Sequence, residues 1–248
     1  KTKFVFALYG HAAIKYGRTK VDKMLDEIIE YMKLQHWQTV KGNRPLVPVL
    51  WPLQFESMLA AQTSASERMT LAQFIDLIRT RATEAGLENP YIVAQEISRT
   101  YLNEDKFVTA GFDAISDYAG AYGGSTSPRD QGPTYASATN AMISEWDLFL
   151  SPDIECVPPM VSGWYNWARA ESVSWWHYQH PLPGDLTTRV QKTFDFISDH
   201  IENCKAQVVF AYSWNEHSEG GTLNPTMGES PDYIPVTTYL DEVAEALK

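Results

Sequence analysis

The chain has 248 residues, of which 44% are hydrophobic and 12% aromatic, so it can bury a full core within one large domain. Its formal net charge of −11 argues against a nucleic-acid partner, because phosphate binding needs clustered lysine and arginine. No apolar stretch approaches the ~20 residues that a transmembrane helix requires, so we expect no membrane span.

The two cysteines, Cys156 and Cys204, lie far apart in the chain and lack the spacing of a zinc site. We expect two small buried thiols, with a single disulfide as the alternative in an exported protein. No signal peptide is present and the chain begins at Lys1, without Met, directly before a strand. A processed product, a trimmed chain or a piece of a longer chain is therefore expected. The sequence does not identify the compartment, and an extracellular or periplasmic one is favoured.

Short apolar runs alternate along the chain with segments of helical periodicity. The runs predict strands at residues 4–9, 46–51, 91–97, 111–118, 155–164 and 206–214. Apolar residues at helical spacing predict helices at residues 21–34, 71–85, 135–150, 188–203 and 237–247. Thr70 is expected to cap the second helix and Gly86 to end it, while Asp185 or Thr187 is expected to cap the fourth. Pro48 is unusual in a strand, because proline lacks the amide donor and usually marks an edge or a bulge.

The order β-α-β-α predicts parallel strands joined by right-handed crossovers, as in a doubly wound sheet or a (β/α)8 barrel. A dinucleotide-binding sheet is disfavoured, because no GxGxxG motif follows the first strand. Long polar and aromatic loops follow the carboxyl ends of most strands, which is where barrel enzymes place their sites. We therefore expect one α/β domain over residues 1–248, of the (β/α)8 TIM-barrel type, with six strand units where a complete barrel has eight.

The last predicted strand leads into a polar segment, S-W-N-E-H-S-E-G-G at residues 213–221. Cleavage of a glycosidic bond needs one carboxyl group to protonate the leaving oxygen, and a second as nucleophile or base. Glu216 and Glu219 come within ~5–6 Å of each other if the turn between them is helix-like. With a buried strand before them and Trp214 and Asn215 beside them, they are the candidate catalytic pair. A solvated acidic loop is the alternative.

This segment, continued by T-L-N-P at residues 222–225, resembles the signature of the glycoside hydrolase family 99-like group. That TIM-barrel group includes endo-α-mannosidases and the WbsX-type proteins of polysaccharide gene clusters. The chain keeps Trp214, Asn215, Glu216, Glu219 and Gly220 of the signature, and has His217 where an aromatic residue is usual. The segments at residues 41–50 and 111–118 also resemble parts of the family. The resemblance implies that the six strands are similar to the third through eighth of the barrel, the first two βα units being absent from this numbering.

The resemblance further implies a retaining mechanism. Glu219 matches the acid/base that protonates the departing oxygen. Glu216 matches the carboxylate that assists the sugar's 2-hydroxyl as internal nucleophile, through an anhydro-sugar intermediate. The chain departs from the endo-α-mannosidases at the end of its first strand, where Tyr9, Gly10 and His11 stand in place of an acidic residue.

Other side chains at strand ends are candidates for substrate binding. Asp117 suits a sugar hydroxyl, or else an N-cap or loop contact. Of Gln95 and Glu96, strand alternation points only one inward. Trp51 and Trp164 offer flat apolar faces to the C–H face of a sugar, or else pack at the rim. The predicted substrate-binding residues are Tyr9, Trp51, Asp117, Tyr118, Trp164, Trp214, Asn215 and His217.

The sequence points to neither a metal nor a cofactor. Its loop histidines, His11, His177, His180 and His217, do not follow HxH or HExxH spacing. A Ser-His-Asp hydrolase is disfavoured, because no GxSxG motif is present. The aromatic loop at residues 165–183 is expected either to close over a ligand or to dock onto a neighbouring domain.

Together these patterns predict a glycoside hydrolase that acts on an oligo- or polysaccharide through Glu216 and Glu219. The alternative is a non-catalytic carbohydrate-binding or polysaccharide-assembly protein on the same fold. A third hypothesis is a chain that stays inactive until a partner segment, such as a missing N-terminal part of the barrel, pairs with its apolar flanks.

Overall fold

The computed structural model describes residues 3–9, 18–62, 64, 66, 68–96, 104–118, 124, 132–164, 177–217, 220–227 and 235–248. The chain folds into two compact units. Unit 1 comprises Lys1–Tyr118, Ser151–Val157 and Glu202–Val208, and unit 2 comprises Ala119–Leu150, Pro158–Ile201 and Val209–Lys248.

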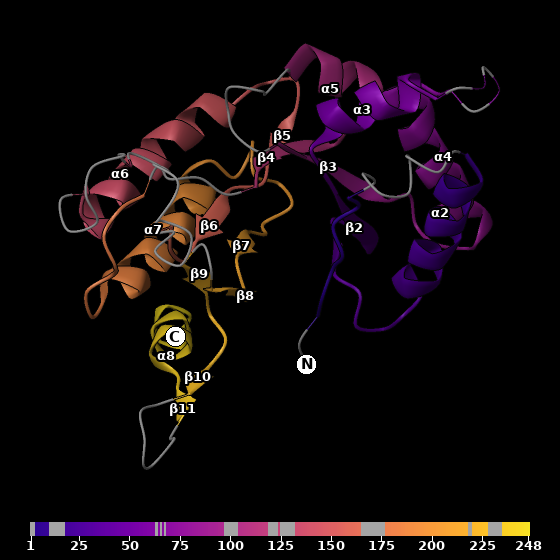
Figure 1. Ribbon diagram of the computed structural model, residues 1–248. Helices are drawn as coiled ribbons and strands as arrows, with labels where there is room; N and C mark the ends of the chain where they lie inside the picture. Colours follow the sequence, from indigo (N-terminus) through magenta and orange to yellow (C-terminus); the bar gives the residue numbers. More distant parts are fainter. Residues whose placement is uncertain are drawn as a thin grey trace. The chain divides into compact units, whose positions relative to one another are not determined.

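Unit 1 contains a sheet of mainly parallel strands (Figure 1). In spatial order these are β1 (Thr39–Val40), β2 (Arg44–Leu50), β3 (Tyr91–Glu96), β4 (Ala114–Asp117) and β5 (Glu155–Cys156). Only β1 is antiparallel to its neighbour, while β2 to β5 are parallel. Every residue of β3 and β4 is buried, as expected for strands covered on both faces. The predicted first strand is an extended segment, joined by isolated parallel bridges from Phe4 to Trp37 and from Leu8 to Val49.

The position of Pro48 within β2 has a simple geometric explanation. Amides of alternate residues face opposite neighbours in a strand. Trp51 donates to the carbonyl of Gln95, at the end of β3, over 2.8 Å, whereas Leu50 donates to Leu8 over 3.0 Å. Pro48 faces the same side as Leu50, and its carbonyl accepts from Leu8 over 2.7 Å. The missing amide therefore costs no β2–β3 bond, because Pro48 turns its nitrogen to the other side of β2, where Leu8 and Val49 form an isolated bridge.

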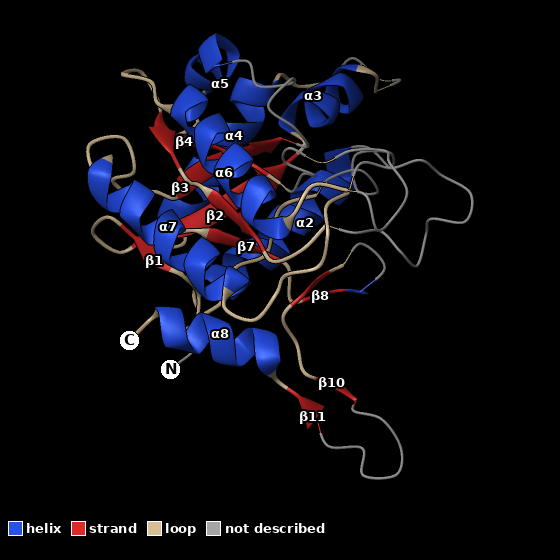
Figure 2. Cartoon of the chain, turned by 90° about the vertical axis from the view of Figure 1, so that its left-hand side faces the viewer, coloured by secondary structure: helices blue, strands red, loops and turns tan. Residues whose placement is uncertain are grey.

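The helices of unit 1 are α2 (Arg18–Met32), α3 (Pro52–Ala60), α4 (Leu71–Glu84) and α5 (Glu104–Ala110). Helix α4 contacts α2, α3 and α5, and Figure 2 shows the helices of this unit beside its red strands. The helices predicted at residues 21–34 and 71–85 are confirmed as α2 and α4. Thr70 and Gln73 form a complete capping box at the start of α4, and Gly86 follows its end with φ 80°.

Helices α3 and α5 were not predicted from the sequence. Helix α3 begins at Pro52, a position where proline costs nothing because the first helical amides have no partner within the helix. Phe55 and Leu59, four residues apart, form its buried face. The side chain of Glu96 accepts from the amide of Leu53 over 2.9 Å, so the end of β3 caps the start of α3.

Unit 2 has two parallel strands, β6 (Pro159–Val161) and β7 (Phe210–Tyr212), in its described part. Its helices there are α6 (Tyr135–Trp146), the short 3-10 helix η3 (Asp147–Phe149), α7 (Asp185–Asp199) and α8 (Thr238–Ala246). Two hairpins follow β7, formed by β8 (Asn215–Glu216) with β9 (Gly221–Thr222), and by β10 (Thr226–Met227) with β11 (Pro235–Val236). Helix α7 contacts α6, α8 and β6.

Three predicted boundaries of this region change in the structure. The strand predicted at residues 155–164 divides into β5 and β6, with the amide-free pair Pro158 and Pro159 at the division. The strand predicted at residues 206–214 is shorter in the structure, where β7 covers only Phe210–Tyr212. Helix α7 begins at Asp185 after Gly184, and the Asp185 side chain accepts from the amide of Leu182 over 2.8 Å instead of capping the helix. The predicted caps are therefore wrong, because the helix starts three residues earlier than expected.

A fully buried arginine fastens α7 to the rest of unit 2. Arg189, 1% exposed, donates to the carbonyl of Val161 at the end of β6, to Thr139 Oγ1 over 2.8 Å and to the Tyr178 hydroxyl over 2.9 Å. It also donates to the carbonyl of Tyr135 over 3.2 Å, and its guanidinium carbon lies 3.6 Å from the centroid of that ring. These acceptors and the ring face offset the cost of burying the charge.

Cys156 and Cys204 are both free and buried in unit 1, which confirms the prediction of two buried thiols. The amide of Cys156 donates to the carbonyl of Asn203 over 2.8 Å, which brings the two cysteine segments together. A hydrogen bond with the Cys204 thiol, together with burial, raises the pKa of the Cys156 thiol. The same hydrogen bond lowers the pKa of the Cys204 thiol.

Candidate active site

The polar segment after β7 folds back on itself as the β8–β9 hairpin. Asn215 lies opposite Thr222 and Glu216 opposite Gly221. Gly220 has φ 76°, which glycine adopts without strain. At Gly221 a Cβ would lie 2.3 Å from Cε1 of the buried Tyr212, so β9 can run past this ring only with glycine at this position. The two glycines therefore place Glu216 directly beyond the end of β7.

Hydrogen bonds from the residues just after β7 fix the backbone of this hairpin. Ser213 Oγ accepts from the amide of Glu216 over 3.1 Å and donates to the carbonyl of Gly221. The carbonyl of Trp214 accepts from the amides of Leu223 over 3.1 Å and Asn224 over 2.9 Å. Both strands of the hairpin are thus attached to the same two residues, and the backbone position of Glu216 is well determined.

The carboxylate of Glu216 is only half-buried, and no residue in the described part of the chain donates a hydrogen bond to it or pairs with it. Its predicted partner Glu219 lies outside the described residues, so the structure gives no distance between the two carboxyl groups. Of Asn215 only the backbone is described. The catalytic pair therefore stays a prediction. Of the two residues, Glu216 has a well-defined backbone position and a carboxylate without a partner among the described residues.

Aromatic side chains surround the start of this hairpin within unit 2. The indole of Trp214 is 58% exposed, which is unusual for so large an apolar group. Trp164, which follows β6, packs its ring 5.5 Å from that of Tyr212, and its carbonyl accepts from the amide of Tyr178 over 3.0 Å. His217 is exposed. These residues are brought together because β6 and β7 are parallel neighbours whose carboxyl ends share an edge.

The other predicted binding residues lie at the carboxyl edge of the unit 1 sheet. Trp51 follows β2, Asp117 ends β4 and Tyr118 follows it, and these strands are parallel. The amide of Tyr118 donates to Asp117 Oδ1 over 2.8 Å. The ring of Tyr9 meets that of Trp51 edge-on, with 5.3 Å between centroids. Unit 1 thus brings together Tyr9, Trp51, Asp117 and Tyr118, whereas Trp164, Trp214, Asn215, Glu216 and His217 belong to unit 2.

Trp51 is held in an unusual state for a tryptophan. Its backbone is left-handed, with φ 54° and ψ 56°, which costs a non-glycine residue of the order of 1–2 kcal/mol. Its indole nitrogen is buried, and no acceptor among the described residues reaches it. Strained backbone and unsatisfied donors gather at functional positions, so both features favour Trp51 as a site residue.

Gln95 and Glu96 are both buried, at 6% and 3% exposure, because β3 is covered on both of its faces. Glu96 caps α3, while Gln95 Nε2 donates to the carbonyl of Asp117 over 3.4 Å. The sequence reasoning missed this role of Glu96 because it missed α3. It also missed Arg189, although Arg189 stands on the buried face of α7 with Leu186, Val190 and Thr193.

No group of three or more His, Cys, Asp or Glu side chains is arranged to hold a metal ion within the ranges that the structure describes. In the same ranges, no helix combines the length and the apolar character needed to cross a membrane. His180 is half-buried, and its desolvation lowers the pKa of its imidazole.

The chain has the fold of a group of glycoside hydrolases. It superposes on the GH99 endo-α-mannosidase of Bacteroides thetaiotaomicron in complex with bis-tris-propane, with a TM-score of 0.53 and 16% identity, over 100% of this chain and 68% of that one. A second structure of that enzyme gives a TM-score of 0.51 and 15% identity, over 100% and 67%. No family model matches the sequence. No curated protein matches it either. The chain is therefore an α/β protein of the (β/α)8-barrel type that spans part of such a barrel, as predicted.

Proposed function

We propose that the chain is a glycoside hydrolase that cleaves a glycosidic bond in an oligo- or polysaccharide with retention of configuration. The observation that carries this proposal is the placement of Glu216. Its backbone is clamped by Ser213 immediately after β7, while its carboxylate has no partner among the described residues. Catalytic side chains in barrel enzymes stand at the carboxyl ends of strands, and a general base must be free to meet its substrate.

In the proposed reaction Glu216 removes the proton of the sugar's 2-hydroxyl while that oxygen attacks the anomeric carbon. Glu219 gives its proton to the departing glycosidic oxygen, so the bond breaks and a 1,2-anhydro sugar forms. In the second step Glu219 takes a proton from water, which attacks the anomeric carbon, and Glu216 returns a proton to the 2-oxygen. The two inversions give net retention. This division requires Glu219 to be protonated and Glu216 ionised at the start.

The proposed substrate is an α-mannose-containing glycan, by analogy with the endo-α-mannosidases that share the fold. The exposed indole of Trp214 offers a stacking face for a sugar ring. Asn215 and His217 lie close to it in the chain, and Trp164 follows the neighbouring strand β6. We propose Tyr9, Trp51, Asp117 and Tyr118 as further sugar ligands, and no metal or cofactor is required by this chemistry.

The test compares Glu216→Gln and Glu219→Gln with the unaltered chain on α-linked manno-oligosaccharides, by product analysis and calorimetric binding. Each variant is expected to lose activity by about 10²–10⁴-fold, which is the usual contribution of an acid or base, while glycan binding persists. With a dinitrophenyl α-mannoside, whose leaving group needs no proton, Glu219→Gln recovers activity and Glu216→Gln does not. Glu202→Gln, on an exposed turn, is the matched control and should behave as the parent.

Unchanged turnover in both variants would remove the pair from the chemistry. A parent chain that binds the oligosaccharides without cleaving any of them would favour the alternative, a carbohydrate-binding or polysaccharide-assembly protein. A product whose anomeric configuration is inverted would exclude the anhydro-sugar route.

A further inference from the structure

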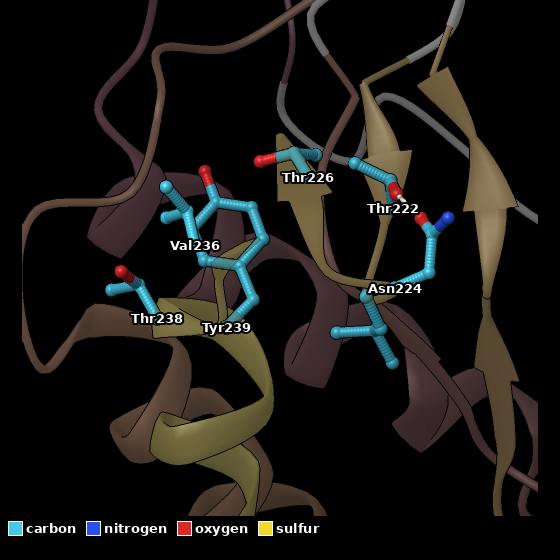
Figure 3. A pocket seen from close by; sticks show the side chains of 7 residues that line it. Thr222, Asn224, Thr226, Val236, Thr238 and Tyr239 are labelled. Carbon is cyan, nitrogen blue, oxygen red and sulfur yellow. Dashed lines mark hydrogen bonds between the residues drawn. The ribbon is translucent and has the colours of Figure 1, made fainter. Parts of the chain in front are cut away.

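The chain that leaves the β8–β9 hairpin lines a partly open cavity of about 310 Å³ in unit 2. This volume lies near the lower end of the ~300–1,000 Å³ found for small-molecule sites. The two walls come from different elements, as Figure 3 shows: β9 and the residues after it on one side, and β11 with the start of α8 on the other. The lining residues are Thr222, Leu223, Asn224, Thr226, Val236, Thr238 and Tyr239.

The lining is polar, uncharged and partly aromatic. Three threonine hydroxyls, one tyrosine and one carboxamide stand beside the apolar side chains of Leu223 and Val236. Thr222 Oγ1 donates to Asn224 Oδ1, the bond drawn dashed in Figure 3. The side-chain nitrogen of Asn224 meets no acceptor among the described residues, so its two N–H groups can donate to a ligand. A set of neutral donors and acceptors around a ring face matches a sugar, which presents hydroxyls at its edge and C–H groups on its face.

The charges around the cavity select against an anionic ligand. Among the described residues, no lysine or arginine lines it. Helix α8 carries an acidic residue shortly after Tyr239: Asp241, which accepts from the hydroxyl of Thr237 over 2.7 Å. The net charge of the chain, −11, points the same way. A phosphate or carboxylate would be repelled, whereas a neutral glycan pays no such cost.

The cavity is tied to the candidate catalytic residue through the hairpin. Thr222 pairs with Asn215 in the β8–β9 register, next to the Glu216–Gly221 pair. Thr222 Oγ1 also lies 3.3 Å from the carbonyl of Trp214. The wall of the cavity is therefore the return strand of the segment that carries Glu216.

From this arrangement we propose that the cavity is an accessory sugar-binding subsite. It holds one neutral sugar unit of the glycan whose cleavage is proposed above, and in this respect it rests on the proposed function. Tyr239 offers its ring to the C–H face of the sugar, and the side chains of Asn224, Thr226 and Thr238 bond its hydroxyls.

The test measures calorimetric binding of methyl α-mannoside and of α-linked manno-oligosaccharides of increasing length, in a Glu216→Gln background that prevents turnover. Val236→Trp fills the cavity from an exposed position, so it should weaken binding of the longer oligosaccharides about tenfold or more. Thr238→Val removes one hydroxyl at constant size and should weaken binding less. Val108→Trp, at an exposed position of α5, is the matched control and should bind as the parent. Thermal unfolding checks that each variant is folded.

Equal affinities of Val236→Trp and Val108→Trp for every oligosaccharide would overturn the subsite, and would leave the proposed function intact if the unaltered chain cleaves the glycan. If the unaltered chain cleaves none of these glycans, but Val236→Trp still abolishes oligosaccharide binding, the hydrolase proposal fails and the sugar site stands. Lack of any binding of these sugars to folded protein would overturn the subsite directly.

Discussion

Each unit has a charged side chain that links several of its helices and strands, a carboxylate in unit 1 and a guanidinium in unit 2. In unit 1 the carboxylate of Asp113 accepts from Arg44 over 2.6 Å, from Arg79 over 2.9 Å and from the amide of Ile92 over 2.8 Å. These three side chains are 18–21% exposed. In unit 2 the guanidinium of Arg189 is almost wholly buried, and no carboxylate among the described residues pairs with it.

The difference shows two ways of stabilising a charge inside a fold. Asp113 is balanced by opposite charges and stays in partial contact with water, so its desolvation cost is small. Arg189 is balanced by neutral oxygens and ring faces alone, and its loss removes a hydrogen bond from each of those buried oxygens. We therefore expect loss of the arginine to cost more than loss of the carboxylate.

The largest effect is expected for Arg189→Met. Methionine fills much of the same volume, but it leaves the Val161 carbonyl and the Thr139 and Tyr178 hydroxyls without their donor. The free energy of unfolding should fall by about 3–5 kcal/mol, measured by urea denaturation. Lys192→Met, which removes a single surface bond to Asn140 on α6, is the control and should cost about 0.5 kcal/mol or less. Equal costs for the two variants would contradict the assigned role of Arg189.

Gly221→Ala tests whether crowding fixes the hairpin of unit 2. The new Cβ must displace the Tyr212 ring or the strand, so we expect a loss of about 1–3 kcal/mol together with reduced turnover. Gly86→Ala in unit 1 meets no atom within 4 Å but must adopt φ 80°, so it should cost about 1 kcal/mol and leave turnover unchanged. Denaturation and kinetics on both variants separate steric crowding from backbone strain. Full activity of Gly221→Ala would show that the hairpin tolerates displacement.

Asp113→Asn should have a smaller effect than Arg189→Met. The neutral side chain can still accept from Ile92 and bond one arginine, so we expect a loss of about 1–2 kcal/mol. Because the network is partly exposed, the loss should shrink in 1 M salt, where charges are screened within ~3 Å. The loss caused by Arg189→Met should not change with salt. A salt-independent effect of Asp113→Asn would remove the contrast between the units.

The smallest effects concern tyrosine ionisation. Burial, then the hydrogen bond to Glu155, raises the pKa of Tyr91, while burial raises the pKa of Tyr178 against the opposing charge of Arg189. A group with a raised folded-state pKa stabilises fully below its unfolded pKa of ~10, and this stability is lost as the pH rises above that value. Unfolding free energies between pH 9 and 11 should therefore fall less steeply in Tyr91→Phe than in the parent chain. Tyr31→Phe, at an exposed position, should leave the slope unchanged.

The elements predicted correctly from sequence are those with strong local patterns. Helix α4 has its cap, its apolar period and its terminal glycine within the same short segment, and β3 is an unbroken apolar run. Helix α3 was missed because much of its start is stabilised from outside, by Glu96 at the end of another strand. The strand predicted at residues 155–164 was divided by a proline pair whose effect depends on which neighbour each amide must reach.

The sequence by itself determined the alternation of strands and helices and the polar segment that carries Glu216, because hydrophobic periodicity and turn glycines act over a few residues. Only the tertiary structure decided which candidate side chains are already engaged in hydrogen bonds within the protein. Glu96 was a candidate at the end of β3, yet its carboxylate accepts from the amide of Leu53 at the start of α3, a helix far from it in the sequence. Ser213 holds the backbone of Glu216, whose carboxylate has no partner among the residues that the structure describes. Hydrogen bonds such as that of Glu96 join groups that are far apart in the chain, and local sequence patterns carry no information about them.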